Sequence, residues 1–163
     1  MTGAHAMTFH SLYDAHAKDV YRFARFLTGS DDAAADVTSE TFLRAWAGRD
    51  AIRTATAKAY LLAIARNLAR DRARSASRLS DSEVPEMAVP PNAEARLELT
   101  RTLAAVRALP AEYREPLLLA AAGVRYDEIG RLLGLSVGVV KIRVHRARLK
   151  LGAAVTAAPG RLT

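Results

Sequence analysis

Apolar residues recur at helical spacing along most of this chain, and no segment alternates apolar with polar residues as a strand does. A first helix is predicted over about 7–27, with Gly29 as its natural stop. Asp31 or Asp32 can cap a second helix that continues to about Trp46. The beginning of the chain is therefore expected to form two helices.

The third predicted helix, about 57–78, has two different faces. Its apolar positions indicate the buried face, formed by Leu61, Ile64, Ala65 and Leu68. Arginines spaced four residues apart make a basic stripe on the other side, at Arg66, Arg70, Arg74 and Arg78. This helix is expected to pack by one side and to present positive charge on the other.

Residues 79–94 interrupt the helical pattern. They hold three prolines and several acids without a helical period, which is typical of a flexible linker. The helices predicted after the linker cover about 95–108, 110–122, 126–133 and 137–152, and the tail beyond them is expected to be disordered. Pro116 conflicts with the second of these helices and should kink it. The predicted fold class is all-α, with two small helical domains joined by a flexible linker.

The segment YDEIGRLLGLSVGVVKIRVHRARLKL, residues 126–151, predicts a helix-turn-helix. Gly134 permits the left-handed backbone of a tight turn, Leu135 fills the space between the helices, and Ser136 can cap the second helix. The buried stripe of that second helix is expected to be Val140, Val144, Ala147 and Leu151. Its outward face then carries Lys141, Arg143, His145, Arg146 and Arg148. Such a face suits the major groove of DNA, whereas an ordinary solvated face mixes both signs of charge.

The distribution of charge supports a polyanionic partner. The chain has 163 residues and a net charge of +7. Residues 58–78 carry six cations against one acid, and residues 136–151 carry five against none, which favours two contact surfaces on one long polyanion. The absence of cysteine excludes disulfides and fits a reducing cytoplasm. We expect no signal peptide and no membrane insertion, because no stretch approaches the roughly 20 apolar residues of a membrane span.

Four segments together resemble a known protein family. They are DVTSETFLRAW, AYLLAIARNLARDRAR, LPAEYREPLLL and the helix-turn-helix segment, in this order and on both sides of the linker. In this arrangement residues 9–152 resemble bacterial RNA polymerase sigma factors of the extracytoplasmic-function (ECF) group. The resemblance implies a sigma region 2-like domain over 7–78, a linker over 79–94 and a sigma region 4-like helix-turn-helix domain over 95–152. The first domain would bind core polymerase and the −10 element, and the last would bind the −35 element.

The resemblance also implies functional residues in the first domain. The surface that docks on the clamp coiled coil of the polymerase large subunit corresponds to Asp36, Ser39, Glu40 and Leu43, with Ser39 in place of the usual glutamine. Recognition of the −10 element corresponds to Tyr60, Arg66, Asn67, Arg70 and Arg74. The loop over 47–56 matches the one that receives a flipped base, and Tyr60 could equally be a core aromatic residue.

In the second domain, the positions implied to contact the −35 element are Ser136, Lys141, Ile142, Arg143, His145 and Arg146. Val139 and Ile142 stand where the family usually has threonine and serine, so two hydroxyl groups that could contact DNA are missing. Ile142 can instead touch a thymine methyl group. These departures should alter the preferred promoter sequence.

The predicted function is therefore that of an ECF-type sigma factor, which directs core polymerase to promoters in the cytoplasm. Its expected partners are core RNA polymerase, promoter DNA and an inhibitory anti-sigma factor. A transcription activator with the same C-terminal helices is an alternative, although it would not need the matched N-terminal domain. A helical protein-interaction module leaves both basic blocks unexplained. We predict no enzyme, cofactor or metal site, because no motif offers a nucleophile, base or cofactor loop and the four histidines lack ligand spacing.

Overall fold

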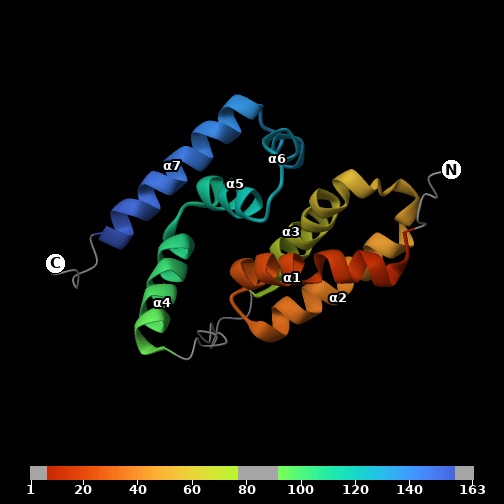
Figure 1. Ribbon diagram of the computed structural model, residues 1–163, viewed down its shortest axis with the longest axis horizontal. Helices are drawn as coiled ribbons and strands as arrows, with labels where there is room; N and C mark the ends of the chain where they lie inside the picture. Colours follow the sequence, from red (N-terminus) through yellow and green to blue (C-terminus); the bar gives the residue numbers. More distant parts are fainter. Residues whose placement is uncertain (1–6, 77–91, 157–163) are drawn as a thin grey trace. The chain divides into compact units, whose positions relative to one another are not determined.

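A computed structural model describes residues 7–76 and 92–156, and the chain divides into two compact units. All regular elements in these described ranges are helices, which confirms the all-α prediction (Figure 1). Unit 1, residues 1–85, contains α1 (Phe9–Thr28), α2 (Asp31–Ala47), the short 3-10 helices η1 (Arg49–Ala51) and η2 (Thr54–Thr56), and α3 (Ala57–Ala76). Unit 2, residues 86–163, contains α4 (Ala93–Ala108), α5 (Ala111–Ala121), α6 (Tyr126–Leu133) and α7 (Val137–Thr156).

The three long helices of unit 1 pack against one another around a single core. Helix α3 contacts both α1 and α2, so its buried face is wide. Leu61, Ala65 and Leu68 are buried as predicted, but Ile64 is only half-buried and Leu62 is fully buried instead. Neighbouring residues on a helix differ by about 100°, so burial of both leucines fits a helix wedged between two others.

The turn between α1 and α2 uses local capping groups. Gly29 adopts the left-handed conformation, with φ 72°, and its N–H donates to the Arg25 carbonyl, so the predicted stop is confirmed. The cap of α2 was predicted wrongly. Ser30 is the N-cap, and its Oγ accepts from the Ala33 N–H at 3.3 Å.

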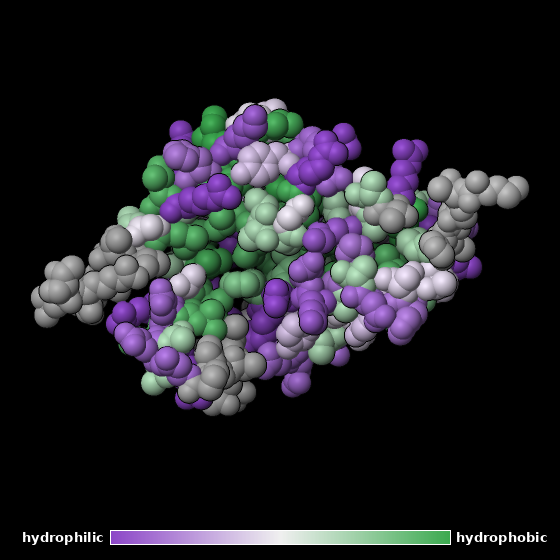
Figure 2. Space-filling model, viewed as in Figure 1, coloured by the Kyte–Doolittle hydropathy of each residue, from purple (hydrophilic) through white to green (hydrophobic). Residues whose placement is uncertain are grey.

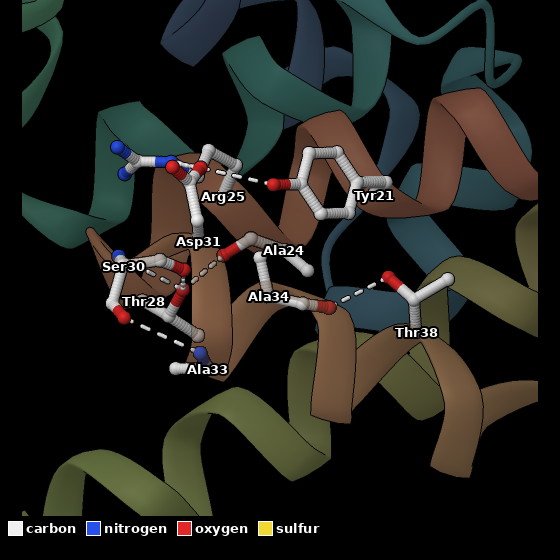
Figure 3. A network of polar contacts seen from close by, with 9 residues as sticks. All are labelled: Tyr21, Ala24, Arg25, Thr28, Ser30, Asp31, Ala33, Ala34 and Thr38. Atoms are coloured by element: carbon white, nitrogen blue, oxygen red, sulfur yellow. Dashed lines mark hydrogen bonds and ion pairs between the residues drawn. The ribbon is translucent and has the colours of Figure 1, made fainter. Parts of the chain in front are cut away.

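Asp31 does not cap α2 because two residues of α1 engage its carboxylate (Figure 3). Its Oδ1 accepts hydrogen bonds from Arg25 Nε at 2.6 Å and from the Tyr21 hydroxyl at 2.9 Å. These contacts, led by the Tyr21 hydrogen bond, lower the pKa of Asp31. A carboxylate in the first turn of a helix is also favoured by the helix dipole. This side chain therefore ties α1 to the start of α2.

In unit 2, α7 packs against α4, α5 and α6. The predicted linker ended too late, because Asn92 caps α4 with its side chain and residues 93–94 are already helical. Pro116 lies within α5 with its ring fully buried, and the helix continues through it to Ala121. Packing of the ring therefore outweighs the loss of one backbone hydrogen bond. Helix α7 is longer than predicted, and the rest of the predicted linker and tail lies outside the described residues.

Within the described ranges, no helix combines the length and the apolar character that a membrane crossing requires.

Candidate nucleic-acid interface

The corner between α6 and α7 is the best-defined local geometry in unit 2. Helix α6 ends at Gly134, whose φ of 69° is left-handed, so the predicted role of this glycine is confirmed. Ser136 precedes α7, and its Oγ accepts from the Val139 N–H at 3.2 Å, which confirms the predicted cap. The two helices therefore form the tight corner of a helix-turn-helix.

Gly130, which was not among the predicted site residues, fixes how closely the two helices approach. The Leu135 N–H donates to the Gly130 carbonyl at 2.8 Å. A Cβ atom added to Gly130 would lie 2.5 Å from the Leu135 carbonyl oxygen, which is too close. A glycine inside a short amphipathic helix was the available signal, because glycine is unfavourable there without a packing reason.

The outward face of α7 is cationic. Val140, Val144 and Ala147 are fully buried as predicted, and Leu151 is half-buried. The exposed side chains are Lys141, Ile142, His145, Arg146 and Arg148, while Arg143 is half-buried. Figure 2 shows hydrophilic and hydrophobic residues intermixed over this helix. The face can neutralise phosphates and offer donors to base edges.

Helix α3 presents the second basic surface. Asn67, Arg70 and Arg74 are exposed, whereas Arg66 is half-buried. Tyr60 and Asn67 are seven residues apart, about two turns, and so lie on the same side of the helix. An amide, an aromatic ring and guanidinium groups along one side are suited to a single nucleic-acid strand. Arg78 lies outside the described residues.

Tyr60 lies beneath the loop that joins α2 to α3. It is half-buried, and a Cβ atom on Gly48 would come within 3.2 Å of its hydroxyl oxygen. In the same loop, the Arg49 guanidinium lies over the Trp46 ring, 4.7 Å from its centroid. The ring of Tyr60 is therefore partly packed and partly open at the loop predicted to receive a base.

A groove of about 850 Å³ runs between α2 and α3. The four residues predicted to bind polymerase all line it, at Asp36, Ser39, Glu40 and Leu43. Their spacing of three and four residues puts them on one face of α2. The opposite wall is made by α3 residues, including Leu68 and Arg72, whose position opposite α2 sequence reasoning did not predict. Leu43 is 62% exposed, so the groove offers an apolar contact beside its acids.

Asp36 and Glu40, two of the acids that line the groove, are ion-paired within unit 1. Asp36 Oδ2 lies 3.3 Å from Arg72 Nη2, across the groove on α3. Glu40 Oε1 accepts from Arg44 Nε at 2.9 Å, one turn along α2. All four side chains are substantially exposed, so each pair is weak and can be exchanged for another partner.

The described residues show no group of three or more His, Asp or Glu side chains arranged to hold a metal ion. The exposed His10 pairs with Asp14 one turn along α1, with His10 Nε2 3.0 Å from Asp14 Oδ2.

Family models match both units. The model for sigma-70 region 2 matches residues 12–79, and the model for sigma-70 region 4 matches residues 99–151. The first match contains the groove and the basic side of α3, and the second contains the helix-turn-helix.

Several proteins and solved structures are similar to the chain. It is 35% identical to the ECF RNA polymerase sigma factor SigE of Mycolicibacterium smegmatis over 83% of its own length, but spans only 57% of SigE. It is also 35% identical to the ECF RNA polymerase sigma factor SigL of Mycobacterium tuberculosis, covering 88% of this chain and 86% of SigL. The sigma factor RpoE from Bartonella quintana, solved with the anti-sigma factor NepR, matches with a TM-score of 0.74 and 28% identity, covering 92% of this chain and 98% of RpoE.

Proposed function

Because this chain belongs to the extracytoplasmic-function group of RNA polymerase sigma factors, we propose that its two units divide the work of promoter recognition. As a member of this family, the chain acts in transcription initiation with RNA polymerase and promoter DNA. We propose that it contributes binding and positioning and carries out no chemical step. Its site of action would be the cytoplasm, where bacterial RNA polymerase lies.

Unit 2 would bind the −35 element as duplex DNA. The observation that carries this assignment is the acid-free outward face of α7, held by the α6–α7 corner. The N-terminal half of a recognition helix reaches deepest into the major groove. Ser136, Lys141, Ile142, Arg143, His145 and Arg146 would form the contacting set, with Arg146 the strongest candidate for a guanine edge.

Unit 1 would open and hold the −10 element. Its basic side on α3 carries Asn67, Arg70 and Arg74 exposed, with Arg66 half-buried beside them. An unstacked base needs a polar or aromatic surface, and Tyr60 lies half-buried beneath the loop at the start of this helix. The backbone of the unpaired DNA strand would lie along these arginines of α3.

The groove between α2 and α3 would receive the clamp coiled coil of the polymerase. Asp36 and Glu40 supply negative charge and Leu43 supplies an exposed apolar surface, all on one face of α2. A basic helix that exchanges the pairs with Arg72 and Arg44 is the expected partner. Ser39 is shorter than the glutamine usual in the family and would leave one polar contact weaker.

We further propose that an anti-sigma factor restrains the chain. The similar sigma factor RpoE was solved in complex with the anti-sigma factor NepR. Exposed apolar residues occur on both units, for example Leu43 and Leu97, and could be covered by such a partner.

Run-off transcription with core polymerase and a cognate promoter tests the proposal. We expect specific transcripts when the purified chain is the only initiation factor added. An activator would give none unless another sigma subunit were present, so the absence of transcripts from a polymerase-bound chain would contradict the proposed function. Transcription should also fall steeply with added salt, because the DNA contacts are made by arginine and lysine.

A further inference from the structure

Ile142 lies outside the buried stripe of α7. With about 100° per residue, it falls roughly opposite the buried Val140, Val144 and Ala147. Half of its surface, 50%, is exposed. Isolated exposed isoleucines are common, but this one lies on the outward, cationic face of the predicted recognition helix, next to Lys141. An apolar side chain at this position is therefore placed where base edges would be read.

Gly138, about one turn before Ile142, leaves the same side of α7 without a side chain. Its backbone does not have a positive φ. An added Cβ atom would meet only Ser136 Oγ, at 4.0 Å. Within residues 92–156, no neighbouring atom therefore requires glycine here, although glycine is less favourable than alanine inside a helix. The missing side chain leaves room for a ligand atom against Ile142.

We propose that Ile142 packs against the 5-methyl group of one thymine in the promoter element bound by α7, with Gly138 leaving room for that base. This inference rests on the proposed role of unit 2. Thymine is the base whose major-groove edge carries a methyl group. The isoleucine has no hydrogen-bonding group, so it would also leave the amino group of a cytosine without its water partner. Both effects favour thymine at one defined position.

The neighbouring cations would have a different task. Lys141 and Arg146 can neutralise phosphates or donate to guanine, and these contacts do not depend on a methyl group. Removing Ile142 should therefore relax selectivity at one base pair and leave the other preferences intact. This pattern separates a base-reading isoleucine from one that merely supports the fold of α7.

The test uses holoenzyme assembled from the full chain and core polymerase. Promoters are first selected from a library randomised in the upstream element, and each selected thymine of that element is then replaced singly by deoxyuridine. Deoxyuridine removes the methyl group and keeps the hydrogen-bonding edge. We expect binding to weaken roughly three- to tenfold at one position, as for the loss of one buried methyl group.

Two variants make the test specific. Ile142→Ser holoenzyme should bind the thymine and deoxyuridine promoters equally at that position. Leu149→Ser is the matched control, because Leu149 is a 60% exposed apolar residue about two turns further along α7 and should leave the methyl dependence unchanged. Circular dichroism of both variants verifies that α7 is folded.

Three outcomes would contradict parts of this scheme. If the holoenzyme selects a defined upstream sequence but no deoxyuridine replacement weakens its binding, the Ile142 proposal is wrong and the proposed role of unit 2 stands. If deoxyuridine still weakens binding by the Ile142→Ser holoenzyme, another residue makes the methyl contact and the Ile142 proposal is also wrong. Failure of the holoenzyme to select any upstream sequence would instead contradict the proposed function of unit 2.

Discussion

Asp36 on α2 and Arg72 on α3 form an ion pair across the groove, with 3.3 Å between Asp36 Oδ2 and Arg72 Nη2. The acid assigned to polymerase docking therefore has a competitor within its own unit. Because both side chains are about half-exposed or more, the pair contributes little to stability. Its effect should be seen in binding, because a polymerase that docks at this carboxylate would have to replace Arg72.

We therefore expect Arg72→Gln to tighten binding of core polymerase about threefold, with a change in unfolding free energy below about 1 kcal/mol. Affinity measured by fluorescence anisotropy and stability measured by urea unfolding test this expectation. Arg44→Gln is a matched variant that releases Glu40 instead. Weaker binding by Arg72→Gln would mean that Arg72 itself contacts the polymerase. Asp36→Asn should weaken binding whether or not Arg72 is present.

The division of labour between the units predicts opposite profiles for two substitutions. Arg146→Ala should weaken binding of −35 duplex by about 1–3 kcal/mol and leave polymerase binding unchanged. Glu40→Ala should weaken polymerase binding and spare the isolated −35 duplex. Gel-shift titrations with duplex and pull-downs with core polymerase measure both quantities. Equal effects of both substitutions in both assays would refute the assignment of the two surfaces.

The helix-turn-helix corner predicts contrasting effects for two glycines. Gly130→Ala should destabilise unit 2 by about 2 kcal/mol or more and abolish duplex binding, because its Cβ atom would lie 2.5 Å from the Leu135 carbonyl oxygen. Gly152→Ala, in α7, should be neutral or stabilise the protein by up to about 1 kcal/mol, since no atom of the described residues lies within 4 Å of the added atom. Thermal unfolding followed by circular dichroism distinguishes them. A Gly130→Ala variant as stable as the parent would show that the corner can open.

Asp31 predicts a pH-dependent contribution to the stability of unit 1. The Tyr21 hydrogen bond and the Arg25 contacts hold the pKa of Asp31 below its ordinary value. A group with a depressed folded-state pKa stabilises the protein above its unfolded-state pKa of about 3.9, and this stabilisation is lost as the pH falls through the folded-state pKa. The parent chain should therefore be more stable than Asp31→Asn near neutral pH, and the two should converge in acid.

Asp32→Asn is the control for this comparison. Asp32 also lies in the first turn of α2, so it experiences the same helix dipole without the Tyr21 and Arg25 contacts drawn in Figure 3. Urea unfolding from about pH 3 to pH 7 is the measurement. If Asp32→Asn matched Asp31→Asn across this range, the dipole rather than the α1 contacts would be responsible.

Sequence reasoning was most accurate where structure depends on neighbouring residues. The bounds of α6, the left-handed Gly134 and the Ser136 cap were all predicted, because backbone permissiveness and a hydroxyl at a helix start act locally. Burial of Val140, Val144 and Ala147 on α7 also followed from helical spacing alone.

Sequence reasoning failed where the local structure depends on a residue of another helix. The cap of α2 was assigned to Asp31 or Asp32, but Tyr21 and Arg25 of α1 engage Asp31 and leave Ser30 to cap. The α3 wall of the groove was missed because helical spacing on α2 gives no information about which helix lies opposite.

The contact between Gly130 and the Leu135 carbonyl helps to separate the residues that orient α7 from the residues that can vary on its surface. The angle at which α7 leaves the corner is set by backbone atoms and by side chains on its hidden side, none of which would touch DNA. Outward positions such as Ile142 and His145 can therefore change without disturbing that angle. Evolution or protein engineering could therefore change the promoter preference of this protein by substituting a few exposed residues of α7, while the α6–α7 corner stays the same.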